Sequence, residues 1–119
     1  SLYQFQSDAI RDVAKQNDRC VFVGRTADYI LRDNPNCVNV FITSPMQTRI
    51  ANVCARRGCT KDEARKLIEN GESERAKYYN YYTAKTWGHA ESYDLCIDAS
   101  ILGLEGTKDL IADFIRRRA

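Results

Sequence analysis

Residues 20–31 read CVFVGRTADYIL, and they are the strongest indication of architecture in the chain. The first four residues are apolar and predict a short strand that is covered on both faces. The strand stops at Gly24, and Arg25 follows directly. Ligands of open α/β sheets bind at the carboxyl ends of strands, where an arginine is suited to hold a phosphate or a carboxylate. We therefore expect Arg25 to bind an anion.

On either side of this stretch, strands and helices alternate along the chain. Helices are predicted at residues 2–16, 26–31, 45–57, 60–70, 72–84 and 104–118, and strands at residues 20–23, 38–42 and 93–98. Such alternation is typical of an α/β fold with a parallel sheet and crossover helices. We predict a partial parallel sheet of about three strands with flanking helices.

Two capping boxes are expected at helix starts. Ser44 with Gln47, and Thr60 with Glu63, have the spacing in which each side chain bonds the other residue's backbone N–H. These pairs predict that one helix begins just after Ser44 and that the next begins just after Thr60.

Two further expectations concern the later helices. Gly71 is expected to interrupt the helical stretch after Thr60, so residues 70–73 are interpreted as a hinge. In the last helix, the apolar face that we expect to be buried consists of Leu110, Ile111, Phe114 and Ile115.

Composition limits the class of protein. The chain has 119 residues, 44% of them hydrophobic, which is enough for one domain with a core and too little for two. Its formal net charge is only +2, so no basic excess points to nucleic acid as a partner. Its apolar runs are only a few residues long, which predicts no membrane partner. We expect a cytoplasmic protein.

The cysteines indicate no metal site. There are five of them, an odd number, and no two have the C-x-x-C spacing. His89 is the single histidine. We expect reduced, free thiols that behave as small hydrophobic side chains, and no bound metal.

Further arginines are candidate anion ligands. Arg49 and Arg56 are seven residues apart on one predicted helix and lie on roughly one face. Arg65 lies on the polar side of the next helix, where a surface role is as reasonable as a functional one.

A tyrosine cluster accompanies Arg75. Arg75 precedes Tyr78, Tyr79 and Tyr82 by three, four and seven residues, so aromatic rings are expected to back its guanidinium. The tyrosines are equally suited to packing a helix onto the domain. Asp28 also has two interpretations: it accepts a hydrogen bond from a ribose or base, or it caps the helix that it begins.

Taken together, the strings GRTADYIL, VNVFI, ERAKYYNYY and YDLCID resemble the cytidylate kinase-like family, whose members are P-loop kinases of nucleoside monophosphates. The resemblance covers essentially the whole chain and implies transfer of the γ-phosphoryl group of ATP to CMP or a similar monophosphate. It implies a mobile helical lid at about residues 60–88.

The resemblance also implies roles for single residues. Arg75 corresponds to a lid arginine that reaches the migrating phosphate, with Arg56 and Arg65 as further catalytic candidates. The residues implied to bind substrate are Arg25, Asp28, Arg49 and Tyr79.

One family motif is missing from these residues. The phosphate-cradling loop G-x-x-x-x-G-K-[ST] does not occur, so ATP and Mg²⁺ are expected for a complete enzyme and not for this chain alone. We expect either part of a longer kinase or a truncated, non-catalytic module that binds an anion or nucleotide or associates with itself. A lone copy is expected to leave strand edges unpaired, which favours a homodimer.

Overall fold

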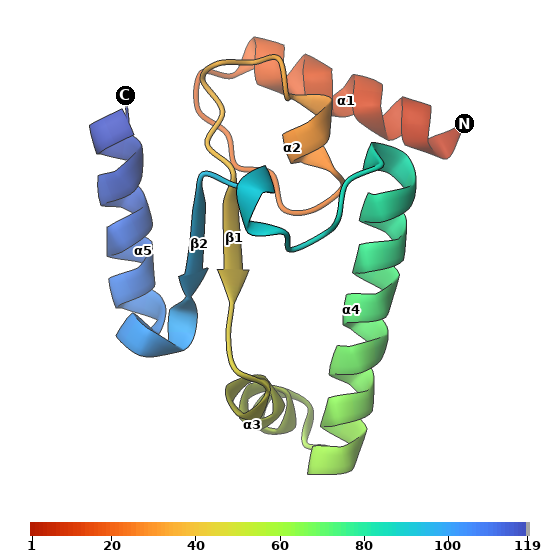
Figure 1. The fold of residues 1–119 in the computed structure, drawn as a ribbon, viewed down its shortest axis with the longest axis vertical. Coiled ribbons are helices and arrows are strands. Elements are labelled where there is room, and N and C mark those ends of the chain that lie inside the picture. The colour runs from red at the N-terminus through yellow and green to blue at the C-terminus, as the bar shows by residue number, and fades with distance from the viewer. Residues whose placement is uncertain (119) are drawn as a thin grey trace.

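The computed structural model describes residues 1–118 as a mixed α/β arrangement around a small parallel sheet (Figure 1). Its elements are α1 (Leu2–Gln16), α2 (Ala27–Ile30), β1 (Val40–Thr43), α3 (Met46–Arg57), α4 (Lys61–Thr83), the short 3-10 helix η1 (Ala90–Ser92), β2 (Leu95–Asp98) and α5 (Ala99–Arg118). In Figure 1, α3 follows the carboxyl end of β1 and α5 follows that of β2. The α/β class expected from the sequence is confirmed.

The sheet has two strands, and the expected strand at residues 20–23 is wrong for the part of the chain described. β1 and β2 pair in parallel, with Val40 opposite Leu95 and Thr43 opposite Asp98. Residues 20–23 form no ladder, and Val21 and Val23 are each 90% exposed. A strand is held in place by backbone hydrogen bonds to a neighbouring strand, and no segment within residues 1–118 forms such bonds with residues 20–23.

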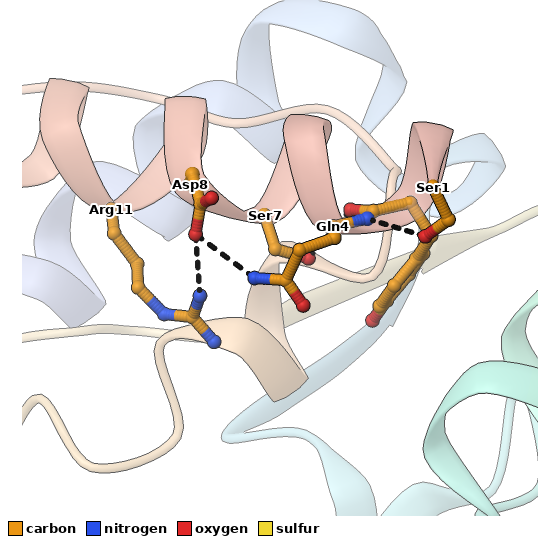
Figure 2. A network of polar contacts seen from close by, with 6 residues as sticks. Ser1, Gln4, Ser7, Asp8 and Arg11 are labelled. Carbon is orange, nitrogen blue, oxygen red and sulfur yellow. Dashed lines mark hydrogen bonds and ion pairs between the residues drawn. The ribbon is translucent and has the colours of Figure 1, made fainter.

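Ser1 caps α1, and polar side chains follow on one face of that helix (Figure 2). The Ser1 hydroxyl accepts a hydrogen bond from the backbone N–H of Gln4 at 3.2 Å, which satisfies one free donor of the first turn. One turn on, the Asp8 carboxylate accepts from the Gln4 amide at 3.0 Å and from Arg11 at 3.4 Å. This face points away from the core and supports the helix locally.

The capping box at Thr60 is confirmed, and the one at Ser44 is wrong. The Thr60 hydroxyl accepts from the Glu63 N–H at 3.2 Å, and the Glu63 carboxylate accepts from the Thr60 N–H at 3.0 Å. These bonds hold the pKa of Glu63 below its usual value. In α3, Pro45 takes the cap position with ψ 149°, and no side chain caps the helix. Ser44 therefore lies one residue outside it.

Gly71 does not interrupt α4, so the predicted hinge is absent from this structure. The helix runs unbroken from Lys61 to Thr83. A glycine inside a helix costs about 1 kcal/mol relative to alanine, which is small compared with the packing of a whole helical face. Whether α4 moves as a lid stays a prediction.

The last helix contains a break and buries less than expected. Gly103 has φ 71° and ψ −178°, which separates residues 99–102 from the helix proper. Leu110 and Ile115 are 40% and 45% exposed, so burial of the full apolar face is wrong. Each strand has only four residues and is about 13 Å long, which is shorter than the roughly 22 Å that residues 104–118 of the helix span.

The tyrosines of α4 pack that helix onto the N-terminal part of the chain. Tyr82 stacks on Tyr3 of α1 with ring centroids 3.9 Å apart, and the Tyr78 hydroxyl donates to the side-chain oxygen of Gln6 at 3.1 Å. Tyr79 is 5% exposed and belongs to a small core with Ile30 of α2. In Figure 1, α4 thus runs from α3 to α1. No helix in residues 1–118 has the length and apolar character needed to cross a membrane.

Candidate anion-binding site

A groove with a volume of about 470 Å³ lies between α3 and α4. We call it the arginine groove, and its lining residues are Arg49, Asn52, Val53, Arg56, Arg57, Leu67, Ile68, Gly71 and Arg75. Within each helix, the main lining positions recur at intervals of three and four residues, so each helix presents one face. Val53 and Ile68 are half-buried and supply apolar surface beneath the charged groups.

The groove carries a strong excess of positive charge. Four of its lining residues are arginines. Within residues 1–118, the guanidiniums of Arg56, Arg57 and Arg75 have neither a carboxylate partner nor a hydrogen bond. Arginine presents planar donors that match phosphate and carboxylate oxygens. The groove therefore suits an anionic ligand.

Arg49 is the one groove arginine that is paired within the described residues. Its Nη1 donates to the Glu72 carboxylate on α4, which links the two helices. Its Nε is covered and has no hydrogen-bond partner. A buried donor without an acceptor is costly, so this arginine is only partly satisfied by Glu72.

Arg75 points into the groove and not onto the tyrosines. A Cβ placed on Gly71 would lie 3.7 Å from Nη1 of Arg75, so the guanidinium lies over that glycine one turn earlier. Side chains of a helix lean toward its N-terminus, which carries Arg75 away from Tyr78 and Tyr79. The expected aromatic backing of this arginine is therefore wrong, although its place in an anion site agrees with the groove.

Asp28 and Tyr79 form a separate pair near α2. The buried Tyr79 hydroxyl donates to Oδ2 of Asp28 at 2.7 Å. Burial raises the pKa of Tyr79 far above its usual value, and the hydrogen bond to Asp28 adds to that rise. Asp28 therefore ties α2 to α4, and α2 has no side-chain cap. Its assignment as a substrate ligand stays a prediction.

Arg25, three residues before Asp28 in the chain, lies outside the arginine groove. It is exposed, and its φ of 58° places it in the left-handed region, next to a glycine with φ 73°. Burial raises the pKa of Tyr78, and the charge of Arg25 opposes that rise. Arg25 is therefore close to the Tyr78 hydroxyl.

The structure thus gathers only some of the predicted site residues. Arg49, Arg56 and Arg75 share the groove, while Arg65 is exposed on α4 and does not line it. Arg57 and Glu72 were missed by the sequence analysis. Glu72 shares one helical face with Gly71 and Arg75, but its pairing with Arg49 on another helix has no signal in the sequence.

Two further features of the described residues bear on cofactors. In residues 1–118, no three His, Cys, Asp or Glu side chains lie close enough together to hold a metal ion. The five cysteines are free thiols, and Cys54 and Cys59 are half-buried around the turn between α3 and α4. Burial raises the pKa of Cys54, with the Cys59 thiol as the next cause.

Comparison with known proteins identifies relatives of one kind. The model of the cytidylate kinase-like family matches residues 1–101. A cytidylate kinase of Methanocaldococcus jannaschii is 30% identical over 108 residues, which are 87% of this chain and 59% of that protein. A cytidylate kinase of Methanosarcina barkeri is 24% identical over 91 residues, 75% of this chain and 50% of that protein.

A solved structure agrees with the fold. An uncharacterized protein from Eubacterium ventriosum superposes with a TM-score of 0.87 at 29% identity, covering 98% of this chain and 66% of that one. The chain spans 50% to 59% of the length of the curated relatives it matches. With the family model matching residues 1–101 of the 119, the chain belongs to the cytidylate kinase-like family.

Proposed function

We propose that this chain supplies the acceptor-side and lid residues of a nucleoside monophosphate kinase. The reaction is transfer of the γ-phosphoryl group of ATP to CMP or a similar monophosphate. Family membership supports the class of reaction, and the two relatives described above are named cytidylate kinases. The helical lid is assigned to about residues 60–88, which contain α4.

The observation that carries the proposal is the arginine groove. Phosphoryl transfer develops charge on the equatorial phosphate oxygens, and a well-placed arginine contributes about 10³ to 10⁵ in rate. Arg56 and Arg75 have no internal partner among residues 1–118, so their donors are available to phosphate oxygens. We assign these two residues to the migrating phosphoryl group and Arg49 to its neighbouring phosphate.

The second group of residues is assigned to the acceptor. Arg25 is exposed and lies close to the Tyr78 hydroxyl, and the Asp28–Tyr79 hydrogen bond holds α2 against α4. We assign Arg25 to the acceptor monophosphate and Asp28 with Tyr79 to the walls of that site. Arg65 joins the catalytic set only if α4 moves, because it is exposed outside the groove.

The proposed reaction requires ATP and Mg²⁺, but the residues present do not form a complete binding site for either of them. No G-x-x-x-x-G-K-[ST] loop occurs in the sequence, and no metal-holding cluster occurs in residues 1–118. The groove arginines match phosphate oxygens and not a metal ion. We therefore assign the ATP cradle and the Mg²⁺ ligands to none of the described residues.

The test is a kinase assay on the complete natural protein. Arg75→Ala is expected to lower kcat for ATP-dependent phosphorylation of CMP by about 10³-fold, because it removes charge from the transition state. Arg117→Ala is the matched control, since Arg117 pairs with Asp113 on α5 and does not line the groove. Equal turnover in wild type and Arg75→Ala would remove Arg75 from the mechanism.

A non-catalytic module that associates with itself is the second candidate. The observation in its favour is apolar surface around the small sheet, where Val21, Val23 and Ile42 are exposed. The sheet of β1 and β2 also has a free edge on each strand, and such edges pair readily with a second copy. Light scattering that shows a dimer, together with no phosphoryl transfer in the assay above, would favour this alternative.

A further inference from the structure

Glu72 does not line the arginine groove, but it pairs with Arg49, which does. Its carboxylate accepts a hydrogen bond from Nη1 of Arg49 across the interface of α3 and α4. The two side chains remain 30% and 37% exposed. Ion pairs that water reaches contribute little net stability, so stability alone does not account for a carboxylate paired with a groove arginine.

The pairing also leaves Arg49 incompletely satisfied. A carboxylate bound in the two-pronged manner would accept from two guanidinium N–H groups. Here Glu72 accepts from Nη1, while Nε is covered and has no acceptor. A phosphate group carries more acceptor oxygens and more charge than a carboxylate. Phosphate is therefore the better partner for Arg49, and it satisfies the neighbouring arginines at the same time.

We propose that Glu72 is an internal counter-anion, which holds Arg49 in the absence of ligand and is displaced by the phosphate groups of a nucleotide. The inference rests on the proposed function, because it takes the arginine groove to be the phosphate site. Glu72 then competes with the ligand for Arg49. A monoanion such as acetate does not displace Glu72, whereas a multiply charged phosphate does. The residue thereby contributes to specificity for polyphosphates.

The first test measures binding of inorganic pyrophosphate and of acetate to the complete natural protein by calorimetry. Glu72→Gln is expected to bind pyrophosphate about two- to fivefold more tightly, the range of a partly exposed ion pair. It is also expected to bind acetate measurably where wild type does not. Glu69→Gln is the matched control, because Glu69 is an exposed acid of the same helix that pairs with none of the groove arginines among residues 1–118.

The outcomes separate this inference from the proposed function. If Glu72→Gln binds pyrophosphate no more tightly than wild type does, the proposal that Glu72 is a counter-anion is wrong. If Arg56→Ala loses pyrophosphate binding in that case, the groove itself still stands. If wild type binds no pyrophosphate, both proposals fall.

A second measurement needs no variant at Glu72. Addition of pyrophosphate to wild type is expected to shift the NMR resonance of the Arg49 Nε–H, because this donor gains an acceptor. A saturating titration in which that resonance does not move would overturn the exchange of partners.

Discussion

Replacement of Tyr79 by phenylalanine tests the link between α2 and α4. Tyr79 is 5% exposed, and its hydroxyl donates to Asp28 at 2.7 Å. A hydrogen bond to a charged group contributes about 1.5–3 kcal/mol, and water can partly replace the lost donor because Asp28 is half-buried. We expect Tyr79→Phe to lower the free energy of unfolding by about 1–2 kcal/mol at pH 7.

The pH dependence of this difference is more diagnostic than its size. Burial and the bond to Asp28 raise the pKa of Tyr79 in the folded protein above its unfolded value of about 10. The folded state therefore keeps the phenol protonated where the unfolded state loses its proton. Stability from this group is complete below pH 10 and is lost as pH rises, by about 1.4 kcal/mol between pH 9 and pH 11.

The assay is urea unfolding of wild type and Tyr79→Phe at pH 7, 9 and 11, followed by circular dichroism. Tyr78 also has a raised pKa, but it titrates in both proteins and cancels in the difference. Tyr93 is replaced by phenylalanine in both proteins, because the Tyr79 hydroxyl affects its pKa. The two unfolding free energies are expected to converge by about 1.4 kcal/mol between pH 9 and pH 11. A difference in unfolding free energy that stays constant from pH 9 to pH 11 would refute the assignment of Tyr79 as a buried, hydrogen-bonded phenol.

Two glycine substitutions test the helices by thermal unfolding. Gly71→Ala is expected to raise stability by about 0.5–1 kcal/mol, because its Cβ meets Arg75 only at an ordinary 3.7 Å and alanine favours the helix; a lower melting temperature would contradict a continuous α4. Gly106→Ala is expected to lower the free energy of unfolding by about 1 kcal/mol or more, because its Cβ would lie 2.7 Å from the Cβ of Leu102. An unchanged melting temperature would show that Leu102 does not lie this close to residue 106.

Local signals in the sequence predicted most of the helices. The capping box at Thr60 and the left-handed Gly58 mark real helix ends, because they depend on neighbouring backbone alone. The expected break at Gly71 failed because glycine is a weak helix breaker, and the apolar contacts of α4 with α3 outweigh it. The helix preference of one residue therefore says little about the packing of a whole helix of 23 residues.

The strand that was wrongly predicted at residues 20–23 shows what local sequence does not specify. Its apolar composition is that of a buried strand, but strand formation requires a partner that local sequence does not specify. For the site, spacing placed Arg49 and Arg56 on one face of α3, and the structure adds Arg75 from α4. Which elements face each other is set by tertiary packing. Glu72 was missed because its role depends on a residue 23 positions away.

The most direct test is a crystal structure of the complete protein with an analogue in which CMP and ATP are joined through their phosphates. We expect phosphate oxygens within hydrogen-bond distance of Arg56 and Arg75, with Glu72 released from Arg49. An analogue bound elsewhere, with the arginine groove holding only water, would show that the groove is not the phosphate site.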